Sequence, residues 1–381
     1  MAAQPFTIHV PDAVLDDLKR RLEQTRWPDE IPDAAWDYGS NLGYMKELVE
    51  YWRTRFDWRA QERHLNSLPH FKADVDGLAI HFMHIKGKGP NPLPLIVTHG
   101  WPGSVFEMYK IAGPLTDPAS YGGDPADAFD LVVPSLPGYG FSDMPKERGV
   151  GVGRTAELWT TLMTDVLGYP RFGAQGGDWG AAVTTALGYL SPKEVVGIHV
   201  NMVLGRVVGD PVGEMSSAEK QWREAMAAWR ANESAYAQLQ GTKPQTLGYG
   251  LNDSPTGLAA WIVEKWRTWS DCGGDVESVY TKDELLTNVM IYWTTGTINS
   301  SVRYYYENGH TPPPVPRENR VEVPVAVAAF PKELMRPPRE VAERIYNIQR
   351  WTDMPRGGHF AAMEQPNLLV EDVRAFFKTL R

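Results

Sequence analysis

A glycine-rich turn with an acidic residue at its centre is the stretch of this sequence best suited to chemistry. It reads Gly176-Gly177-Asp178-Trp179-Gly180 and separates an apolar-ended segment from a run of small residues. A strand-to-helix turn of this kind exposes its central side chain on a strained backbone, and its flanking residues must be small. Gly176 and Gly180 meet that need. A carboxylate exposed in this way is a nucleophile that can form an ester with an electrophilic carbon.

Two residues further along the chain could complete a catalytic triad. After a nucleophile of this type, the acid and the histidine follow in that order, each after a strand. His359 lies in a glycine-rich turn before the last expected helix and is the best placed of the nine histidines. Glu333 follows the strand expected to end at Ala329 and is the candidate acid, with a surface salt bridge as its alternative role. Asp353 competes for that position but lies close to His359 in sequence.

Hydrolysis of an ester also needs backbone N–H donors for the developing oxyanion, one after the nucleophile and one from the loop after an earlier strand. Trp179 and Trp101 hold these positions. His99 lies two residues before Trp101. We expect His99 to support this loop through hydrogen bonds and to transfer no proton.

Strands alternate with helices over most of the chain, which predicts an α/β fold. Strands buried on both faces of a parallel sheet are short, continuous apolar runs. Four segments have this character: 93–98, 129–134, 195–200 and 323–329. Helices are expected between them and at 339–345 and 368–380. The alternation predicts a mostly parallel sheet with helices on both faces.

Two segments depart from this alternation. Residues 1–70 combine helical periodicity with several tryptophans and predict a segment that wraps a larger unit. Residues 204–313 are rich in helix formers and aromatic residues and predict an inserted helical cap, or lid, that encloses a pocket. The remaining ranges, 71–203 and 314–381, are the two parts of the sheet domain.

Composition argues against several other functions. The chain has 381 residues and a net charge of 38 − 47 = −9, which argues against nucleic acid or an anionic membrane as partner. The single cysteine, Cys272, cannot form an internal disulfide, and no Cys/His cluster has zinc spacing, so we expect neither metal nor other cofactor. No apolar run of about 18 residues occurs. We expect a cytoplasmic, soluble protein. The sequence does not decide whether it is a monomer or a homo-oligomer.

At these motifs the chain resembles the epoxide hydrolases of the α/β-hydrolase superfamily, specifically the microsomal type. The resemblance covers almost the whole chain. Besides the elbow at 176–180, it rests on motifs at 99–104, 251–255, 287–297 and 356–360. Membrane-bound relatives carry an N-terminal anchor, whereas this sequence begins at the wrapping segment. It therefore looks like a soluble, bacterial member.

The resemblance implies a mechanism and two further site residues. In that family two cap tyrosines hydrogen-bond the epoxide oxygen, and local matches place them at Tyr236 and Tyr305, the latter in a run of three tyrosines. Asp178 would open the epoxide to a covalent ester. His359, held by Glu333, would then activate water, and a vicinal diol would leave.

Other functions are open to test. A haloalkane dehalogenase shares the aspartate nucleophile and the histidine-activated water, but it needs halide-stabilising donors and no paired cap tyrosines. A serine esterase is excluded because Asp178 occupies the nucleophile position. A catalytically silent small-molecule receptor is disfavoured because all the candidate catalytic residues are present together. The aromatic-rich cap suits a bulky apolar or aryl epoxide, in detoxification or natural-product biosynthesis, although core packing explains the same residues.

Overall fold

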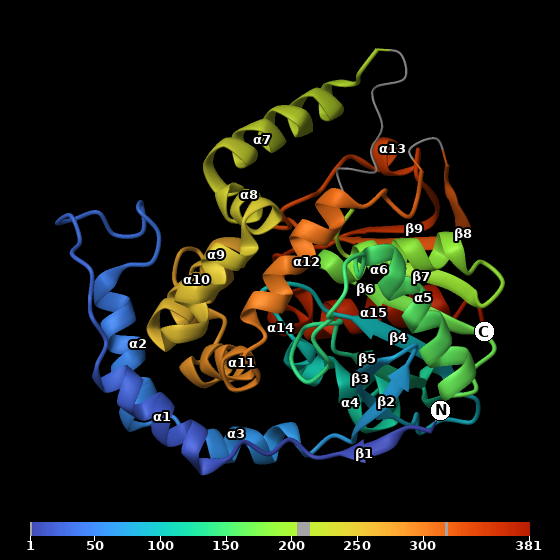
Figure 1. Cartoon of the computed structure of the whole chain (residues 1–381). Coiled ribbons are helices and arrows are strands. Elements are labelled where there is room, and N and C mark those ends of the chain that lie inside the picture. Colours follow the sequence, from blue (N-terminus) through green and yellow to red (C-terminus); the bar gives the residue numbers. More distant parts are fainter. Residues whose placement is uncertain (1, 204–213, 317–318) are drawn as a thin grey trace.

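A nine-stranded sheet lies at the centre of the computed structural model, which describes residues 2–203, 214–316 and 319–381 (Figure 1). The strand order is β1-β2-β3-β5-β4-β6-β7-β8-β9. The strands are β1 (Gln4–Phe6), β2 (His70–Val75), β3 (Leu78–Ile85), β4 (Leu93–Thr98), β5 (Phe129–Pro134), β6 (Phe172–Gly176), β7 (Val195–Val200), β8 (Val321–Ala329) and β9 (Tyr346–Asp353). Every pairing from β5 across to β9 is parallel, whereas β1, β2, β3 and β5 pair antiparallel. The mostly parallel sheet predicted from the sequence is confirmed.

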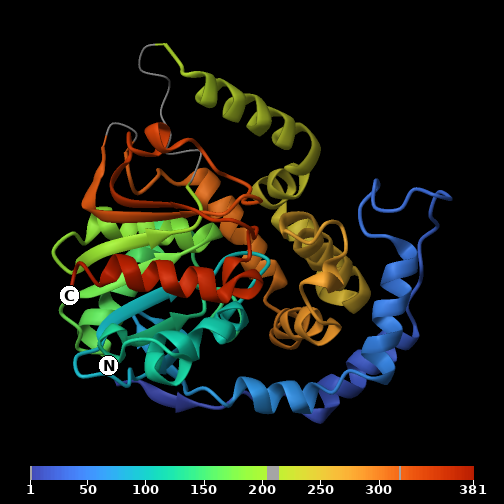
Figure 2. The ribbon, with the colours of Figure 1, turned by 180° about the vertical axis from the view of Figure 1, so that it is seen from behind.

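Helices cover both faces of this sheet. They are α4 (Tyr109–Thr116), α5 (Val152–Thr161), α6 (Asp178–Leu190), α13 (Arg339–Ala342), α14 (Ala361–Glu364) and α15 (Pro366–Phe377). Side chains alternate along each strand, so Ile96 of β4 packs into the core shared with α5 and α6, whereas Leu95 and Val97 pack into the core shared with α4 and α15. Figure 2 shows α15 crossing the second face.

The helix predicted at 339–345 is wrong in its second half, because α13 ends at Ala342. The carbonyl of Ile345 accepts a hydrogen bond from the Val321 N–H at 2.8 Å, so the backbone already belongs to the β8–β9 pairing. Burial of Ile345 as the chain enters the sheet outweighs its helical periodicity.

Six helices, here called the inserted helices, lie between β7 and β8 in the chain. They are α7 (Ser217–Glu233), α8 (Ala235–Thr242), α9 (Pro244–Asp253), α10 (Pro255–Trp269), α11 (Lys282–Thr295) and α12 (Ile298–His310). Helix α12 packs against α8 and α9, and α10 packs against α9 and α11. The start of the expected cap, at residue 204, lies outside the described residues.

The N-terminal segment joins the sheet to the inserted helices. Its helices are α1 (Asp12–Glu23), α2 (Leu42–Thr54) and α3 (Trp58–Leu65), and its first strand, β1, pairs with β2 at the sheet edge. Arg21 donates to the Asp253 carbonyl at the end of α9, and Ser40 donates to the Ala260 carbonyl in α10, both at 2.8 Å. Figure 1 shows this segment running along one side of the molecule from the sheet to the inserted helices.

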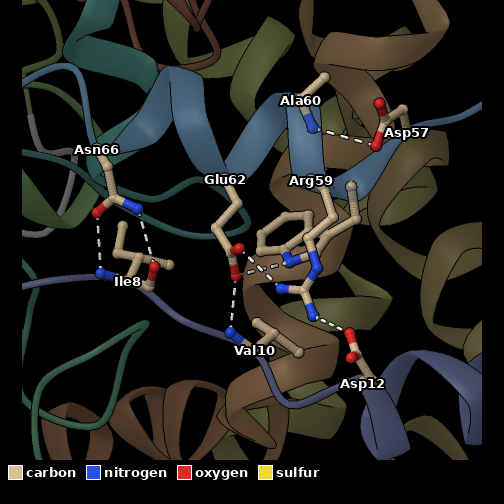
Figure 3. Close-up of polar contacts among 9 residues, drawn as sticks. Ile8, Val10, Asp12, Asp57, Arg59, Ala60, Glu62 and Asn66 are labelled. Carbon is tan, nitrogen blue, oxygen red and sulfur yellow. Dashed lines mark hydrogen bonds and ion pairs between the residues drawn. The ribbon is translucent and has the colours of Figure 1, made fainter.

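A buried carboxylate fixes the beginning of this segment against α3 (Figure 3). Glu62 accepts hydrogen bonds from the Val10 N–H at 2.7 Å and from Trp58 Nε1 at 3.2 Å, and it pairs with Arg59 at 2.7 Å. Asn66 binds both the N–H and the carbonyl of Ile8, at 2.9 and 2.8 Å. These contacts give residues 8–10 a defined path although they form no strand.

Candidate active site

Asp178 lies at the junction of β6 and α6 with φ of +50°, the left-handed backbone that the glycine-rich turn predicts. The turn packs tightly against β4. A Cβ added to Gly180 would lie 1.8 Å from the Thr98 carbonyl oxygen, and one added to Gly176 would lie 2.3 Å from the Gly180 carbonyl carbon. Only glycine permits this approach, which brings the loop after β4 next to the Asp178 carboxylate.

His359 lies between two carboxylates. Its Nε2 is 3.3 Å from Asp178 Oδ2, and its Nδ1 is 2.7 Å from Glu333 Oε1. The turns after β8 and β9 bring these residues together, and a bridge between Lys332 and Gly358 joins the two turns. Asp353, the competing acid, is 66% exposed and pairs with Arg336. The structure therefore places Glu333, and not Asp353, against His359.

The electrostatics of this triad favour an imidazolium while Asp178 is ionised. Burial by itself would lower the pKa of His359, but the charge of Glu333 and the hydrogen bonds with Asp178 and Glu333 outweigh it and hold the pKa well above its ordinary value. Both Glu333 and His359 have almost no exposed side-chain surface, so solvent screens these charges weakly. The protonation state of His359 is therefore coupled to the charge on Asp178.

The loop after β4 donates to the nucleophile. The backbone N–H of Trp101 binds Asp178 Oδ1 at 2.8 Å. His99 accepts from the Leu136 N–H at Nε2, at 3.2 Å, so its Nδ1 carries the proton and donates to the Gly100 carbonyl at 3.0 Å. Burial lowers the pKa of His99 to about 4, which keeps this supporting ring neutral. Trp179 is the second residue of α6, and the first N–H groups of a helix have no intrahelical acceptor.

The two expected tyrosines face the tryptophans on either side of Asp178. Tyr236 of α8 stacks on Trp101, with ring centroids 5.5 Å apart and an interplanar angle of 10°. Tyr305 of α12 meets Trp101 and Trp179 edge to face, at 5.8 and 4.8 Å. The Tyr236 and Tyr305 rings are 6.0 Å apart. Burial raises the pKa of both phenols, and the Asp178 charge raises it further, so both keep their protons.

The neighbours of Tyr305 make other contacts. The Tyr304 ring also meets Trp179 edge to face, at 5.3 Å, but its hydroxyl lies 3.0 Å from Thr155 Oγ1, inside the core beside α5. The Tyr306 ring stacks on His310 at 3.9 Å. Of the three, Tyr305 is the tyrosine whose ring meets both Trp101 and Trp179.

Sequence reasoning missed the contacts that hold the His359 turn. The His359 N–H donates to the Trp269 carbonyl at 3.0 Å, and the Trp269 ring lies 5.1 Å from the imidazole. Glu364 accepts from the N–H groups of Gly358, Phe360 and Asp271, at 2.9, 2.9 and 2.8 Å. The only sequence signal for this role is a glutamate five residues after His359. The role of Glu364 is recognisable only in the structure, where the His359 turn lies next to the end of α10 and Glu364 binds both.

The described ranges contain no group of three or more His, Cys, Asp or Glu side chains arranged to hold a metal ion. Among the helices described, none is both long enough and apolar enough to span a bilayer.

The strand order, the elbow and the covering helices define an α/β hydrolase, and residues 94–251 match the family model described as the alpha/beta hydrolase fold. Residues 3–108 match a second model, described as the epoxide hydrolase N terminus. The chain belongs to the epoxide hydrolase family, and it is an enzyme that hydrolyses epoxides.

Relatives from distant organisms support this assignment. A protein of Stigmatella aurantiaca with a provisional epoxide hydrolase name is 47% identical over 99% of this chain and 85% of its own. Epoxide hydrolase 1 of Oryctolagus cuniculus is 41% identical over 98% of this chain and 88% of its own. The crystal structure of the juvenile hormone epoxide hydrolase from Bombyx mori superposes with a TM-score of 0.88 at 31% identity, covering 100% of this chain and 95% of that one.

Proposed function

We propose that epoxide hydrolysis proceeds in two steps with Asp178 as the nucleophile of the first. Asp178 Oδ2, the oxygen that the Trp101 amide leaves free, attacks an epoxide carbon in line with the breaking C–O bond. Tyr236 and Tyr305 donate hydrogen bonds to the departing oxygen as it gains charge, and one of the two gives it a proton. General-acid help of this kind contributes about two to four orders of magnitude in rate. The product of this step is an ester of Asp178.

In the second step His359 removes a proton from water, and the water oxygen attacks Cγ of the ester. Charge develops on Oδ1, where the backbone N–H groups of Trp101 and Trp179 stabilise it. One such donor contributes about 3 to 4 kcal/mol in other enzymes. The bond between Cγ and Oδ2 then breaks. The vicinal diol leaves with Oδ2 in one hydroxyl, the proton on His359 passes to that oxygen, and the water oxygen remains in Asp178. The second proton of the water leaves the restored Asp178 carboxyl group and returns to the tyrosine that protonated the epoxide oxygen.

The coupling between Asp178 and His359 supports this order of events. While Asp178 is ionised, its charge raises the pKa of His359 and favours the imidazolium. Ester formation removes that charge, so the pKa of His359 falls and the ring becomes a base when a base is needed. Glu333 accepts the hydrogen bond from Nδ1 and thereby holds the tautomer that leaves Nε2 free to accept a proton.

We propose residues 204–313 as a cap over this site and a bulky apolar or aryl epoxide as the substrate. Three rings of the inserted helices, those of Tyr236, Tyr305 and Trp269, approach the tryptophans beside the nucleophile. A wall of aromatic rings favours a large apolar group on the substrate. Detoxification and natural-product biosynthesis both use such epoxides.

The position of the His359 imidazole between Asp178 Oδ2 and Glu333 Oε1 carries the two-step proposal. His359→Gln should form the ester and then stall, because the variant lacks the base for hydrolysis. Mixing this variant with styrene oxide and measuring the intact protein mass should show an adduct of one substrate, and Asp178→Ala should show none. An unmodified mass for a folded His359→Gln variant would contradict the scheme. Halide release from bromoalkanes without diol formation from epoxides would favour the dehalogenase alternative.

A further inference from the structure

A small cavity lies on the inner side of the nucleophile. The space open to the centre of a water molecule there is about 20 Å³, and a cavity needs roughly 10 to 15 Å³ by this measure to hold one water. Asp178 and His359 line it together with four further polar residues, which are His99, Glu107, Gln175 and Asn201. A buried water needs two to four polar partners, and this cavity offers them. Its size and lining therefore suit one ordered water beside the reacting carboxylate.

Glu107 lines this cavity and has no role in the mechanism proposed above. It lies in the single 3₁₀ turn Val105–Met108 after the Trp101 loop, and only 8% of it is exposed. Among the described residues, no arginine or lysine pairs with its carboxyl group, whereas the buried Glu62 and Glu219 pair with arginines. A buried carboxyl group without a counter-ion is costly unless it is protonated or serves a function.

The Glu107 carboxyl group is also fixed in place. A Cβ added to Gly103 would lie 1.6 Å from Glu107 Oε1, and one added to Gly100 would lie 2.1 Å from Asp178 Oδ1. The two glycines of the loop thus make room for two carboxyl groups, the nucleophile and Glu107. Glycine is therefore needed at positions 100 and 103 to leave room for these carboxyl groups as well as to form the turn.

We propose that this cavity holds the water that hydrolyses the Asp178 ester, and that Glu107 orients this water as a hydrogen-bond donor. The inference rests on the two-step function proposed above. One water proton points to His359 Nε2, and one lone pair points to Cγ of Asp178. The second lone pair accepts from the Glu107 carboxylic acid. The Glu107 proton stays on Glu107 throughout, while the water proton moves to His359 as the bond to Cγ forms.

The protonation state of Glu107 fits this role. Burial raises its pKa to about 8, with the Asp178 charge adding to the rise and the His359 charge opposing it. Tyr280 and Tyr292 of the inserted region also face it and keep their protons, because burial raises their pKa values. Glu107 is therefore a neutral donor below about pH 8 in the free enzyme. Ester formation removes the Asp178 charge and favours neutral His359, so these two opposing influences are lost together, and burial still keeps Glu107 protonated. Above that pH it loses the donated proton, and its charge repels the developing oxyanion, so hydrolysis should slow.

Single-turnover kinetics with styrene oxide separate the two steps. We expect Glu107→Leu to form the ester within about threefold of the wild-type rate and to hydrolyse it about 10 to 100 times more slowly, so that the ester accumulates. Glu107→Gln keeps an N–H donor and should lose less. The wild-type hydrolysis rate should fall as pH rises through about 8, and Glu107→Gln should lack this fall, because its amide does not titrate. The matched control is Glu219→Gln, the same change at a buried carboxyl group that pairs with Arg344 outside the site, which should alter neither step.

Several results would overturn the proposal. Hydrolysis at the wild-type rate in Glu107→Leu would do so, as would equal slowing of both steps or an alkaline fall that persists in Glu107→Gln. A high-resolution crystal structure of the unmodified enzyme tests the site without any variant, and an empty cavity there would count against it. If wild-type enzyme never forms an ester, the two-step function fails as well, whereas an ester that forms and hydrolyses normally in Glu107→Leu removes the role of Glu107 alone.

Discussion

At the scale of single residues, the two oxygens of Asp178 have different neighbours. Oδ1 accepts the Trp101 N–H at 2.8 Å, and Oδ2 faces His359 Nε2 at 3.3 Å. In the proposed mechanism, the backbone donor stabilises charge on Oδ1 both before and during ester hydrolysis, and Oδ2 attacks the epoxide. The geometry thus assigns separate tasks to two atoms that are chemically equivalent in a free carboxylate.

The first residue-scale prediction concerns Tyr236 and Tyr305, the two tyrosines proposed as general acids. Tyr305→Phe should slow ester formation by about 10 to 100 times, part of the two to four orders of magnitude typical of general-acid help, because Tyr236 still donates. Tyr304→Phe removes the same hydroxyl one residue earlier, where it contacts Thr155, and should leave ester formation within about twofold. Rapid-quench measurement of the ester compares the two variants. Equal losses would mean that Tyr305 has no special place beside the nucleophile.

The second residue-scale prediction concerns charge coupling in the triad. Asp178→Asn should lower the pKa of His359, because it removes a negative charge that favours the imidazolium. Glu333 remains in the variant, so its contribution to raising the pKa persists. Titration of ¹⁵N-labelled histidine by NMR, with the His359 signal assigned from its loss in His359→Gln, measures the change. An unmoved pKa would remove the electrostatic reason for the proposed order of steps.

At the scale of elements, the turn that carries His359 is held from two sides. Glu364, at the end of α14, accepts N–H groups on both sides of His359 and a third from Asp271, beyond the end of α10. The Trp269 carbonyl accepts the N–H of His359 itself. The inserted helices therefore help to position the base as well as to cover the nucleophile.

Glu364→Ala tests this positioning role. The variant leaves three backbone N–H groups without their acceptor, and each buried unsatisfied group costs about 1 to 3 kcal/mol. We expect a lower free energy of unfolding and a larger loss in ester hydrolysis than in ester formation, since only hydrolysis uses His359. Urea unfolding and single-turnover kinetics measure the two effects. Glu371→Ala, an exposed change on α15, is the control, and a uniform loss in both steps would argue for a purely structural role of Glu364.

At the scale of the whole molecule, the N-terminal segment links the two parts that form the site. It joins the sheet through β1 and reaches α9, α10 and α11, where Tyr51 donates to Asp283 at 3.0 Å. The proposed nucleophile, Asp178, comes from the sheet domain, and the proposed acids, Tyr236 and Tyr305, come from the inserted helices. Because the segment binds both, it limits how far they can separate.

Glu62→Ala should loosen this link. The Val10 N–H and Trp58 Nε1 lose their acceptor, and Arg59 loses a buried partner. We expect a loss of about 2 to 4 kcal/mol in the free energy of unfolding and faster hydrogen exchange in residues 6–14. Glu50→Ala removes an exposed ion pair on α2 and should cost about 1 kcal/mol or less. Equal stability of the two variants would show that the Glu62 contacts do not hold the segment.

The sequence by itself determined the features that depend on local pattern. Apolar runs set most of the strands, glycines set the elbow at Asp178, and the order of Asp178, Glu333 and His359 along the chain set the candidate triad. The apolar runs and the glycine turn survive in a linear sequence because each is encoded by neighbouring residues, whereas the triad was recognised from the order in which such residues follow their strands. The predicted helix at 339–345 was wrong in its second half, because burial of the chain in the sheet outweighed the helical periodicity of these residues.

Only the tertiary structure decided what depends on segments that meet from distant parts of the chain. It distinguishes Tyr305 from Tyr304: the Tyr305 ring meets both Trp101 and Trp179, whereas the Tyr304 ring meets Trp179 and its hydroxyl lies against Thr155. It brings Glu333 rather than Asp353 to His359, and it places Glu107 beside the nucleophile and Glu364 beneath the His359 turn. In the sequence, nothing distinguishes the carboxyl groups of Glu107, Glu333 and Glu364 from those of other acidic residues. Their roles follow from burial and from the neighbours that folding supplies.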